Sequence, residues 1–301
     1  MKKVLVTGGV GFIGVNLIQK LLENNVKVVS IDNYSTGYKS NEIQGVKYFN
    51  YDIEEIEQIQ NRDFDTCFHL AAQSRVQPSF LNPRESIRVN VNGTNRVMEW
   101  AKKRNVKVIY AGSSSKHYDP SDSPYAMSKY LGEEICKLYK KSFHVNVEIA
   151  RFYNVYGPGE NIDEKFGNVI GIWSAKIQNN EPIPIVGDGE QKRDFLYIKD
   201  AVPMTLWLAQ NECATGLFNL GNGLARTWLD LGKSIFSALK LDEQIEFVDM
   251  PEILKDKYQY FTQAKIEKLR IQGYNYDLFS LEEAVKDYVC NYLESNQRLG
   301  A

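Results

Sequence analysis

The chain has 301 residues, of which 43% are hydrophobic and 25% are charged. This length allows one large domain or two modest ones, and the composition is that of an ordinary globular protein. No apolar run approaches the roughly 20 residues of a transmembrane helix, so we expect no membrane span. The net charge of −2 also argues against a nucleic-acid partner.

Cysteine and histidine spacing gives no sign of a metal site. The four cysteines are far apart and contain no CxxC pair, and the three histidines form no HxxxH or HExxH pattern. We therefore expect no bound metal. The apolar run after the first three residues is too short for a signal peptide, which predicts a cytoplasmic protein.

Strand-like and helix-like segments alternate through the first half of the chain. Short apolar runs predict strands at 4–6, 26–31, 46–51, 66–71, 106–111 and 145–150. Helical spacing or helix-start residues predict helices over 12–24, about 84–104 and about 124–141. Such alternation is typical of βαβ units, so we expect an α/β fold with a doubly wound parallel sheet.

The pattern changes after Arg151, where glycines and prolines mark loops and the elements become shorter. We expect residues 154–301 to form mainly a second, smaller lobe that is interleaved with the sheet. Its chain should return to the sheet from about 193–215.

A glycine-rich loop joins the first predicted strand to the first predicted helix. Gly8 allows a tight turn, Gly11 lets the backbone approach a pyrophosphate, and Gly14 lets helix and strand pack closely. The start of the helix then offers free N–H groups to the phosphates. This context predicts a Rossmann-type dinucleotide-binding domain over residues 1–153.

An acidic residue follows about 20 positions beyond the loop. Asp32 ends the second predicted strand, where a carboxylate accepts hydrogen bonds from a ribose 2′-hydroxyl and repels a 2′-phosphate. No arginine stands beside Asp32 in the sequence. We therefore expect the cofactor to be NAD rather than NADP.

Tyr125 and Lys129 form a YxxxK pair on the helix between the fifth and sixth predicted strands. Residues at i and i+4 share one helix face. The preceding strand ends in a run of serines, 113–115. A lysine ammonium and a positive nicotinamide would favour the phenolate of tyrosine, and a serine hydroxyl can hold the substrate oxygen. These residues therefore predict oxidation of a carbinol, with tyrosine as the acid–base group.

The chain as a whole resembles the extended short-chain dehydrogenase/reductases, and within them the nucleotide-sugar epimerases of the UDP-galactose 4-epimerase kind. Besides the glycine loop and YxxxK, the resemblance rests on DI at 52–53, HLAA at 69–72, NVNGT at 90–94, RFYNVYGP at 151–158 and GDGEQKRDF at 187–195. It implies a cytoplasmic enzyme of carbohydrate metabolism, with a role in polysaccharide biosynthesis and a homodimer formed through the two long helices.

The resemblance also implies roles for individual residues. The cofactor would contact Gly8, Gly11, Phe12, Ile13, Gly14, Asp32, Asn33, Asp52, Ile53, Leu70, Ala71, Ala72, Asn90 and Lys129. The catalytic residues would be Tyr125, Lys129 and Ser114, with Ser114 preferred to its neighbours because it lies four positions before Tyr118. The substrate would contact Asn154 and, through its diphosphate, Arg193.

The residues after Ser114 bear on the reaction. Related dehydratases and decarboxylases carry a carboxylate at the next two positions, which are Ser115 and Lys116 here. The favoured prediction is therefore epimerisation of a nucleotide-diphosphate sugar at C4 with NAD. The loop from Ser114 to Tyr125, however, spans only 11 residues, where the family usually has about two dozen.

Two alternatives stay open. The segment KYQYFTQA at 257–264 is similar to one in ADP-glycero-manno-heptose 6-epimerases, which use a lysine as a second base; Lys165 is the candidate here. A heptose 6-epimerase or another nucleotide-sugar oxidoreductase is therefore the second enzyme prediction. A catalytically silent dinucleotide-sensing protein on the same fold is the alternative from another class.

Overall fold

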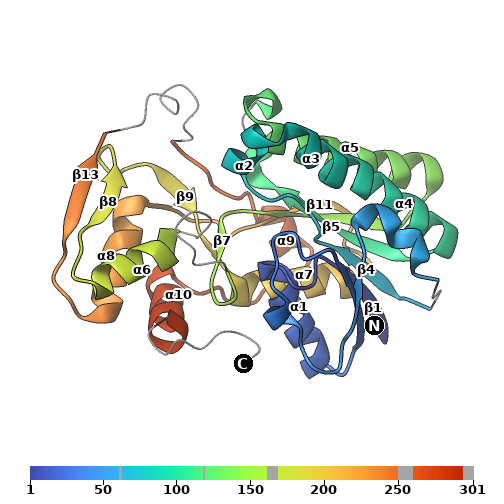
Figure 1. The fold of residues 1–301 in the computed structure, drawn as a ribbon, viewed down its shortest axis with the longest axis horizontal. Helices are drawn as coiled ribbons and strands as arrows, with labels where there is room; N and C mark the ends of the chain where they lie inside the picture. The colour runs from blue at the N-terminus through green and yellow to red at the C-terminus, as the bar shows by residue number, and fades with distance from the viewer. Residues whose placement is uncertain (61–62, 118, 161–168, 250–259, 294–301) are drawn as a thin grey trace.

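A seven-stranded parallel sheet with helices on both faces forms the larger part of the molecule (Figure 1). The computed structural model describes residues 1–60, 63–117, 119–160, 169–249 and 260–293, apart from the side chains of residues 116 and 117. The strands of this sheet are β1 (Lys3–Thr7), β2 (Lys27–Asp32), β3 (Lys47–Asn50), β4 (Thr66–His69), β5 (Lys107–Ser113), β6 (Val147–Phe152) and β11 (Gly216–Leu220).

The strand order places a ligand-binding crevice beside β1. The order across the sheet is β11-β6-β5-β4-β1-β2-β3, and every neighbouring pair is parallel. The chain therefore winds outward in one direction from β1 to β3 and in the other from β4 to β11. Ligands of doubly wound sheets bind where this direction reverses, at the carboxyl ends of the strands.

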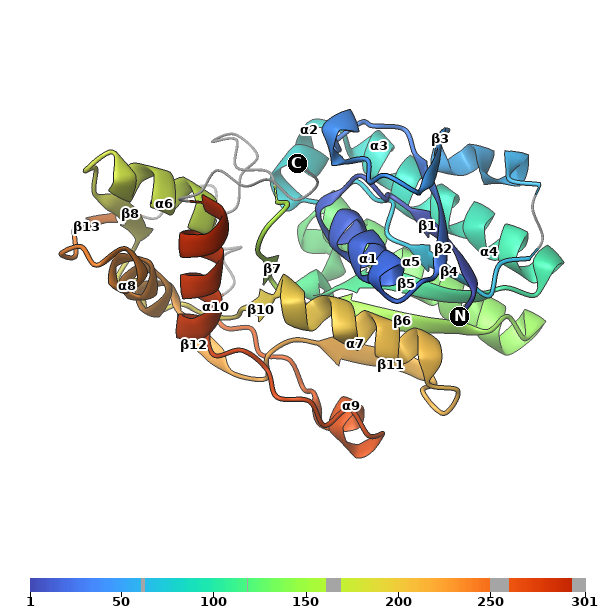
Figure 2. The ribbon, with the colours of Figure 1, turned by 90° about the horizontal axis from the view of Figure 1, so that it is seen from below.

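Helices cover the two faces of the sheet in separate groups, as Figure 2 shows. One face carries α1 (Phe12–Glu23) and α7 (Ile198–Gln210), and the other carries α3 (Pro83–Ile87), α4 (Gly93–Arg104) and α5 (Pro124–Phe143). Alternate residues of β1 supply the two cores: Val4 and Val6 pack with the α1 and α7 side, and Leu5 packs with the α4 and α5 side. This period of two is why short, wholly apolar runs form the central strands.

The predicted helix over about 84–104 is present but not uniform. A π-helical turn at Arg88–Asn92 separates α3 from α4. Such turns insert one extra residue and often mark functional positions. Here the turn carries Asn90, whose side chain is buried.

The second lobe is smaller and is interleaved with the sheet, as the sequence predicts. Its helices are α6 (Val169–Gln178), α8 (Trp228–Leu239) and α10 (Leu281–Tyr288), and α9 (Glu267–Ile271) lies beside β11. Three strand pairs complete it: β7 (Val155–Tyr156) with β10 (Leu196–Tyr197), β8 (Ile183–Val186) with β13 (Ile245–Val248), and β9 (Lys192–Asp194) with β12 (Ala225–Thr227).

The chain returns to the large sheet through α7 and β11, that is, through residues 198–220. The predicted α/β class, with a doubly wound parallel sheet and a smaller interleaved lobe, is confirmed. The described helices include none that is both long and apolar enough to cross a membrane.

Candidate active site

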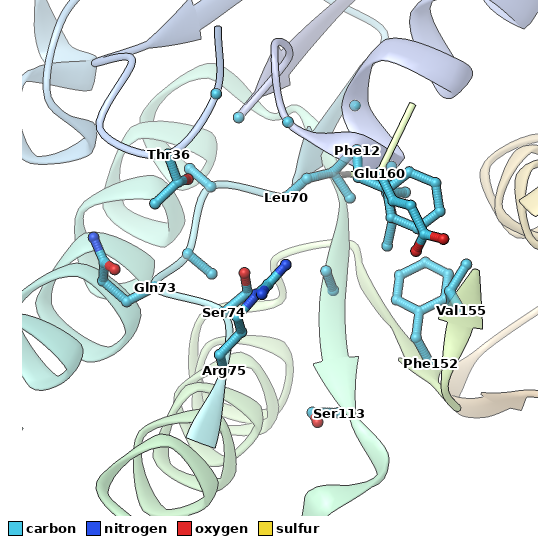
Figure 3. A pocket seen from close by; sticks show the side chains of 18 of the residues that line it. Phe12, Thr36, Leu70, Gln73, Ser74, Arg75, Ser113, Phe152, Val155 and Glu160 are labelled. Carbon is cyan, nitrogen blue, oxygen red and sulfur yellow. The ribbon is translucent and has the colours of Figure 1, made fainter. Parts of the chain in front are cut away.

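One large cavity lies at the carboxyl ends of β1, β2, β4, β5 and β6. Its volume is about 2060 Å³, and it is lined from both lobes, by Gly8 and Asp32 on the sheet side and by Arg193 and Tyr288 on the other. Figure 3 shows part of the lining, with Leu70 and Ser113 to the left of Phe152 and Val155. A drug-sized ligand needs roughly 300–1,000 Å³, so this cavity has room for a dinucleotide and a second ligand together.

The glycine loop has the shape that a pyrophosphate requires. Gly8 has φ +75°, and a Cβ there would meet the backbone nitrogen of Ala71 at 2.7 Å. A Cβ at Gly14 would meet the carbonyl oxygen of Gly8 at 2.2 Å, so a larger residue would push α1 away from the loop. The start of α1 at Phe12 and Ile13 lines the cavity. These residues fit a bound dinucleotide.

Asp32 fixes the glycine loop and stays available to the cofactor. One of its carboxylate oxygens accepts a hydrogen bond from the Val10 N–H at 3.1 Å, and the other accepts from the Tyr34 N–H at 2.9 Å. Burial raises the pKa of Asp32, and these backbone bonds oppose that rise. Each oxygen retains a lone pair for a ribose hydroxyl.

Asp52, one of the predicted cofactor contacts, is held by an ion pair that the sequence did not indicate. Arg88 donates to both oxygens of Asp52 at 2.9 Å, and Asn33 donates to one of them at 3.0 Å. The Arg88 guanidinium lowers the pKa of Asp52 to about 2. Its neighbours Tyr51 and Ile53 line the cavity, whereas Asp52 is not among the described lining residues.

Tyr125 occupies the first turn of α5, which is fixed on three sides. The Ser123 hydroxyl caps the helix by accepting from the Ala126 N–H at 3.0 Å. Ser79 accepts from the Tyr125 N–H at 3.1 Å, and the Ser128 hydroxyl donates to the Tyr125 carbonyl at 2.8 Å. The backbone of the predicted acid–base residue is therefore anchored, and its side chain lines the cavity.

Burial acts on both members of the YxxxK pair. It raises the pKa of Tyr125, against the lowering effect of a hydrogen bond with the Ser113 side chain. It lowers the pKa of Lys129 to about 8, and the Lys129 ammonium donates to the Ala111 carbonyl at 2.9 Å. Burial is therefore the dominant influence on the protonation state of Tyr125 in the free protein, and it favours the neutral phenol.

The serine run divides at the end of β5. Ser113 is the last residue of β5 and contacts Tyr125, and its hydroxyl lies 3.0 Å from that of Ser115. Ser114 begins a short 3₁₀ turn and also lines the cavity. The preference for Ser114 depends on its position four residues before Tyr118, which lies outside the described residues. The catalytic role of Ser114 therefore stays a prediction.

Asn90 supports the cavity from behind. Its side chain accepts from the Gln73 N–H at 2.8 Å and donates to the Gln73 carbonyl at 3.0 Å. The same amide group donates to the Ser128 hydroxyl at 2.8 Å. Asn90 thus links the segment after β4 to the helix of Tyr125. The NVNGT motif indicated a role for Asn90 at the cofactor site. The sequence did not indicate that its side chain bonds Gln73 and Ser128.

The two predicted substrate residues come from the second lobe side of the cavity. Asn154 has φ +27° and donates to the Asp194 carbonyl at 3.0 Å. Arg193 is buried, and its guanidinium lies 5.9 Å from the centre of the Trp228 ring. Both residues line the cavity.

Comparison with known proteins identifies the family. The profile of the NAD dependent epimerase/dehydratase family matches residues 4–221. The chain belongs to this family. An ADP-L-glycero-D-manno-heptose-6-epimerase of Nitratidesulfovibrio vulgaris is 31% identical, over 96% of this chain and 97% of that protein.

Two solved structures of epimerases are similar over nearly the whole chain. The UDP-N-acetylglucosamine 4-epimerase of Methanobrevibacter ruminantium, in complex with UDP-N-acetylmuramic acid, is 28% identical with a TM-score of 0.89, covering 98% of this chain and 99% of that one. The UDP-glucose 4-epimerase of Thermotoga maritima, with UDP-glucose, is 26% identical with a TM-score of 0.88, covering 98% and 100%. The predictions of an epimerase-family enzyme and of NAD as its cofactor are therefore confirmed.

Proposed function

We propose that this epimerase-family enzyme inverts C4 of a nucleotide-diphosphate sugar by oxidation to a keto sugar and re-reduction on the opposite face. The observation that carries the proposal is the position of Tyr125. It lies in one cavity with the glycine loop and Asp32, beside Lys129 and the serines that follow β5. That cavity is large enough for the sugar nucleotide beside the cofactor.

Each polar side chain has a defined task in this reaction. Bound NAD would supply the acceptor and donor of the hydride, and its positive ring would add to the charge of Lys129. Tyr125 removes the proton of the C4 hydroxyl and later gives it back. Lys129 favours the phenolate and holds the nicotinamide ribose, and Ser114 holds the sugar oxygen. Asn154 and Arg193 hold the sugar and the diphosphate, for which a guanidinium fork is well suited.

The heptose 6-epimerase reading is the second candidate. It is supported by the 31% identity, over almost the full length, to an enzyme of that name. It requires a second proton carrier across the substrate. Lys165 is the only lysine close behind the YGP turn, and it lies outside the described residues. Asp32 favours NAD, whereas the resemblance associates heptose epimerases with NADP, so we favour C4 epimerisation.

The test is incubation of the purified protein and NAD with UDP-, GDP-, ADP-, CDP- and dTDP-sugars, followed by NMR of the sugar protons. The expected result is interconversion of one C4 epimer pair. Inversion at C6 of a heptose would support the second candidate. No turnover of any sugar nucleotide, with NAD bound, would favour a catalytically silent dinucleotide-sensing protein.

A further inference from the structure

Arg75 places a positive charge inside the cavity. The residue lies between β4 and α2 (Val76–Leu81) and lines the same cavity as Tyr125. Figure 3 shows its side chain extending from this segment toward the middle of the cavity, on the side opposite Phe152 and Val155. Arg75 is exposed at the cavity wall, and the partial covering of its side chain lowers the pKa of its guanidinium.

The backbone of Arg75 is strained. Its φ is 139° and its ψ is 142°, a region that is close to exclusive to glycine. A side chain persists there only when the surrounding structure over-determines the backbone, and such residues cluster at ligand-binding sites. An arginine at this position is therefore an observation that points to a ligand.

Hydrogen bonds on both sides hold the strained segment. Asn90 clamps both backbone groups of Gln73, two residues before Arg75. Four residues after Arg75, Ser79 accepts from the Tyr125 N–H. Because both clamps are joined to α5, the position of Arg75 is tied to the acid–base residue rather than to the second lobe.

The guanidinium is not used by the fold. Among the residues that the structure describes, none accepts a hydrogen bond from it or forms an ion pair with it within 4.0 Å. The charge of Glu160 acts on the guanidinium and raises its pKa, and the Glu160 carboxylate also accepts a hydrogen bond from the Tyr288 hydroxyl. The other arginine of the cavity, Arg193, comes from β9 in the second lobe.

We propose that Arg75 binds a carboxylate on the sugar ring, so that the substrate is a nucleotide-linked uronic acid; this rests on the proposed function. The carbon that is oxidised must lie at Tyr125, and Arg75 lines the same cavity on a segment tied to the helix of Tyr125, so we assign Arg75 to the sugar. A bound sugar displaces water, and a desolvated guanidinium is costly unless it meets an anion. The two oxygens of a carboxylate match the guanidinium fork, whereas neutral hydroxyls leave its charge uncompensated.

The test compares two ligands that differ only at C6. UDP-glucuronate has a carboxylate there and UDP-glucose has a hydroxymethyl group. Titration calorimetry with saturating NAD should give the wild type at least about tenfold tighter binding of UDP-glucuronate, as expected for a charge-assisted bidentate contact. Arg75→Gly should reduce this ratio of affinities by about tenfold or more. Arg75→Lys, which keeps the charge without the fork, should give an intermediate ratio.

Two controls separate binding from folding. Glycine suits the backbone of residue 75, so the Tm of Arg75→Gly should not fall below that of the wild type. Arg84→Ala removes an exposed arginine of α3 that is not among the described lining residues, and it should keep the wild-type ratio.

Three results would overturn the inference while leaving the proposed function standing. One is equal affinity of the wild type for the two ligands. Another is an equal loss for both ligands in Arg75→Gly, which would place Arg75 on the diphosphate. The third is a loss of NAD affinity in Arg75→Gly with unchanged affinity for both sugar nucleotides. Failure of the wild type to bind the uronate or the hexose of any of the five nucleotides in the panel would instead count against the proposed function, and the inference would fall with it.

Discussion

The proposed chemistry depends most directly on the phenolic oxygen of Tyr125. Tyr125→Phe removes that oxygen and leaves the backbone contacts with Ser79 and Ser128 in place. We expect kcat to fall by about 10²–10⁴, the usual loss for an acid–base group. Steady-state kinetics would measure this loss, with NAD affinity by calorimetry as the control. Activity within a few-fold of the wild type would assign the proton transfer to another residue.

Asp32 makes a separate prediction at the residue scale, about cofactor choice. Its carboxylate should attract the ribose hydroxyls of NAD and repel the 2′-phosphate of NADP. Asp32→Ser replaces the carboxylate with a neutral hydroxyl, which is still a hydrogen-bond acceptor, so the preference for NAD over NADP should narrow. Calorimetric titration of the wild type and of Asp32→Ser with NAD and with NADP measures the change in this preference. A wild type that binds NAD and NADP equally would refute the argument.

Lys165 decides between the two epimerase readings. Lys165→Met keeps the side-chain length and removes the transferable proton. If a single acid–base residue suffices, as in C4 epimerisation, kcat should stay within about tenfold of the wild type, well short of the loss for an acid–base group. A loss as large as that of Tyr125→Phe, with unchanged NAD affinity, would support two-base chemistry and the heptose reading.

At the scale of elements, the sequence predicts what local patterns encode. The six strands of the first half and the glycine loop follow from periodicity and spacing, because the buried parallel strands are short apolar runs. Features set by contacts between distant residues did not follow. The ion pair of Arg88 with Asp52 joins residues 36 positions apart, and the Asn90 clamp on Gln73 joins residues 17 apart. The backbone strain at Arg75 depends on such long-range hydrogen bonds. The sequence alone therefore does not distinguish Arg75 from an ordinary loop arginine.

Asp200, on α7, connects the sheet to the second lobe and makes stability depend on pH. Its carboxylate accepts from the Phe279 N–H at 3.1 Å, just before α10, and burial raises the pKa of Asp200 to about 6. The folded state therefore binds the proton more tightly than the unfolded chain, whose aspartate has a pKa near 3.9. The contribution of Asp200 to stability is fully present below about pH 4 and is lost as the pH rises through about 6. The free energy of unfolding changes by at most about 1.4 kcal/mol per pH unit over this range.

Asp200→Asn keeps the acceptor for Phe279 and has no proton to lose. Its free energy of unfolding relative to the wild type should therefore increase from about pH 4 to about pH 6 and be constant above. Urea unfolding of both proteins across this range measures the difference, and other titrating groups largely cancel in the comparison. A difference that does not vary with pH would mean that Asp200 is ionised throughout.

At the scale of the whole molecule, the cavity exists because the chain crosses three times between its two parts. After β6 the chain enters the second lobe, it returns through α7 and β11, and it leaves again through β12 and α8. The cofactor wall is thus built by the sheet and the substrate wall by both parts. These crossings also fix the second lobe against the sheet through Lys199 and Tyr197, which both contact Asp287 of α10.

The outer surface of α5 leads to the last prediction, which concerns assembly. Leu138 is 52% exposed on this helix, and Phe143 near its end is 44% exposed. We propose that α4 and α5 of two copies pack together in a homodimer, which would cover Leu138 and remove its apolar surface from water.

Leu138→Glu would place a charge in that contact, and we expect the variant to sediment as a monomer at concentrations at which the wild type is a dimer. Leu241→Glu is the matched control, because Leu241 is equally exposed, at 52%, but lies after α8 in the second lobe. Analytical ultracentrifugation of the three proteins gives the answer. A monomeric wild type, or dissociation by Leu241→Glu instead, would contradict a dimer formed through α5.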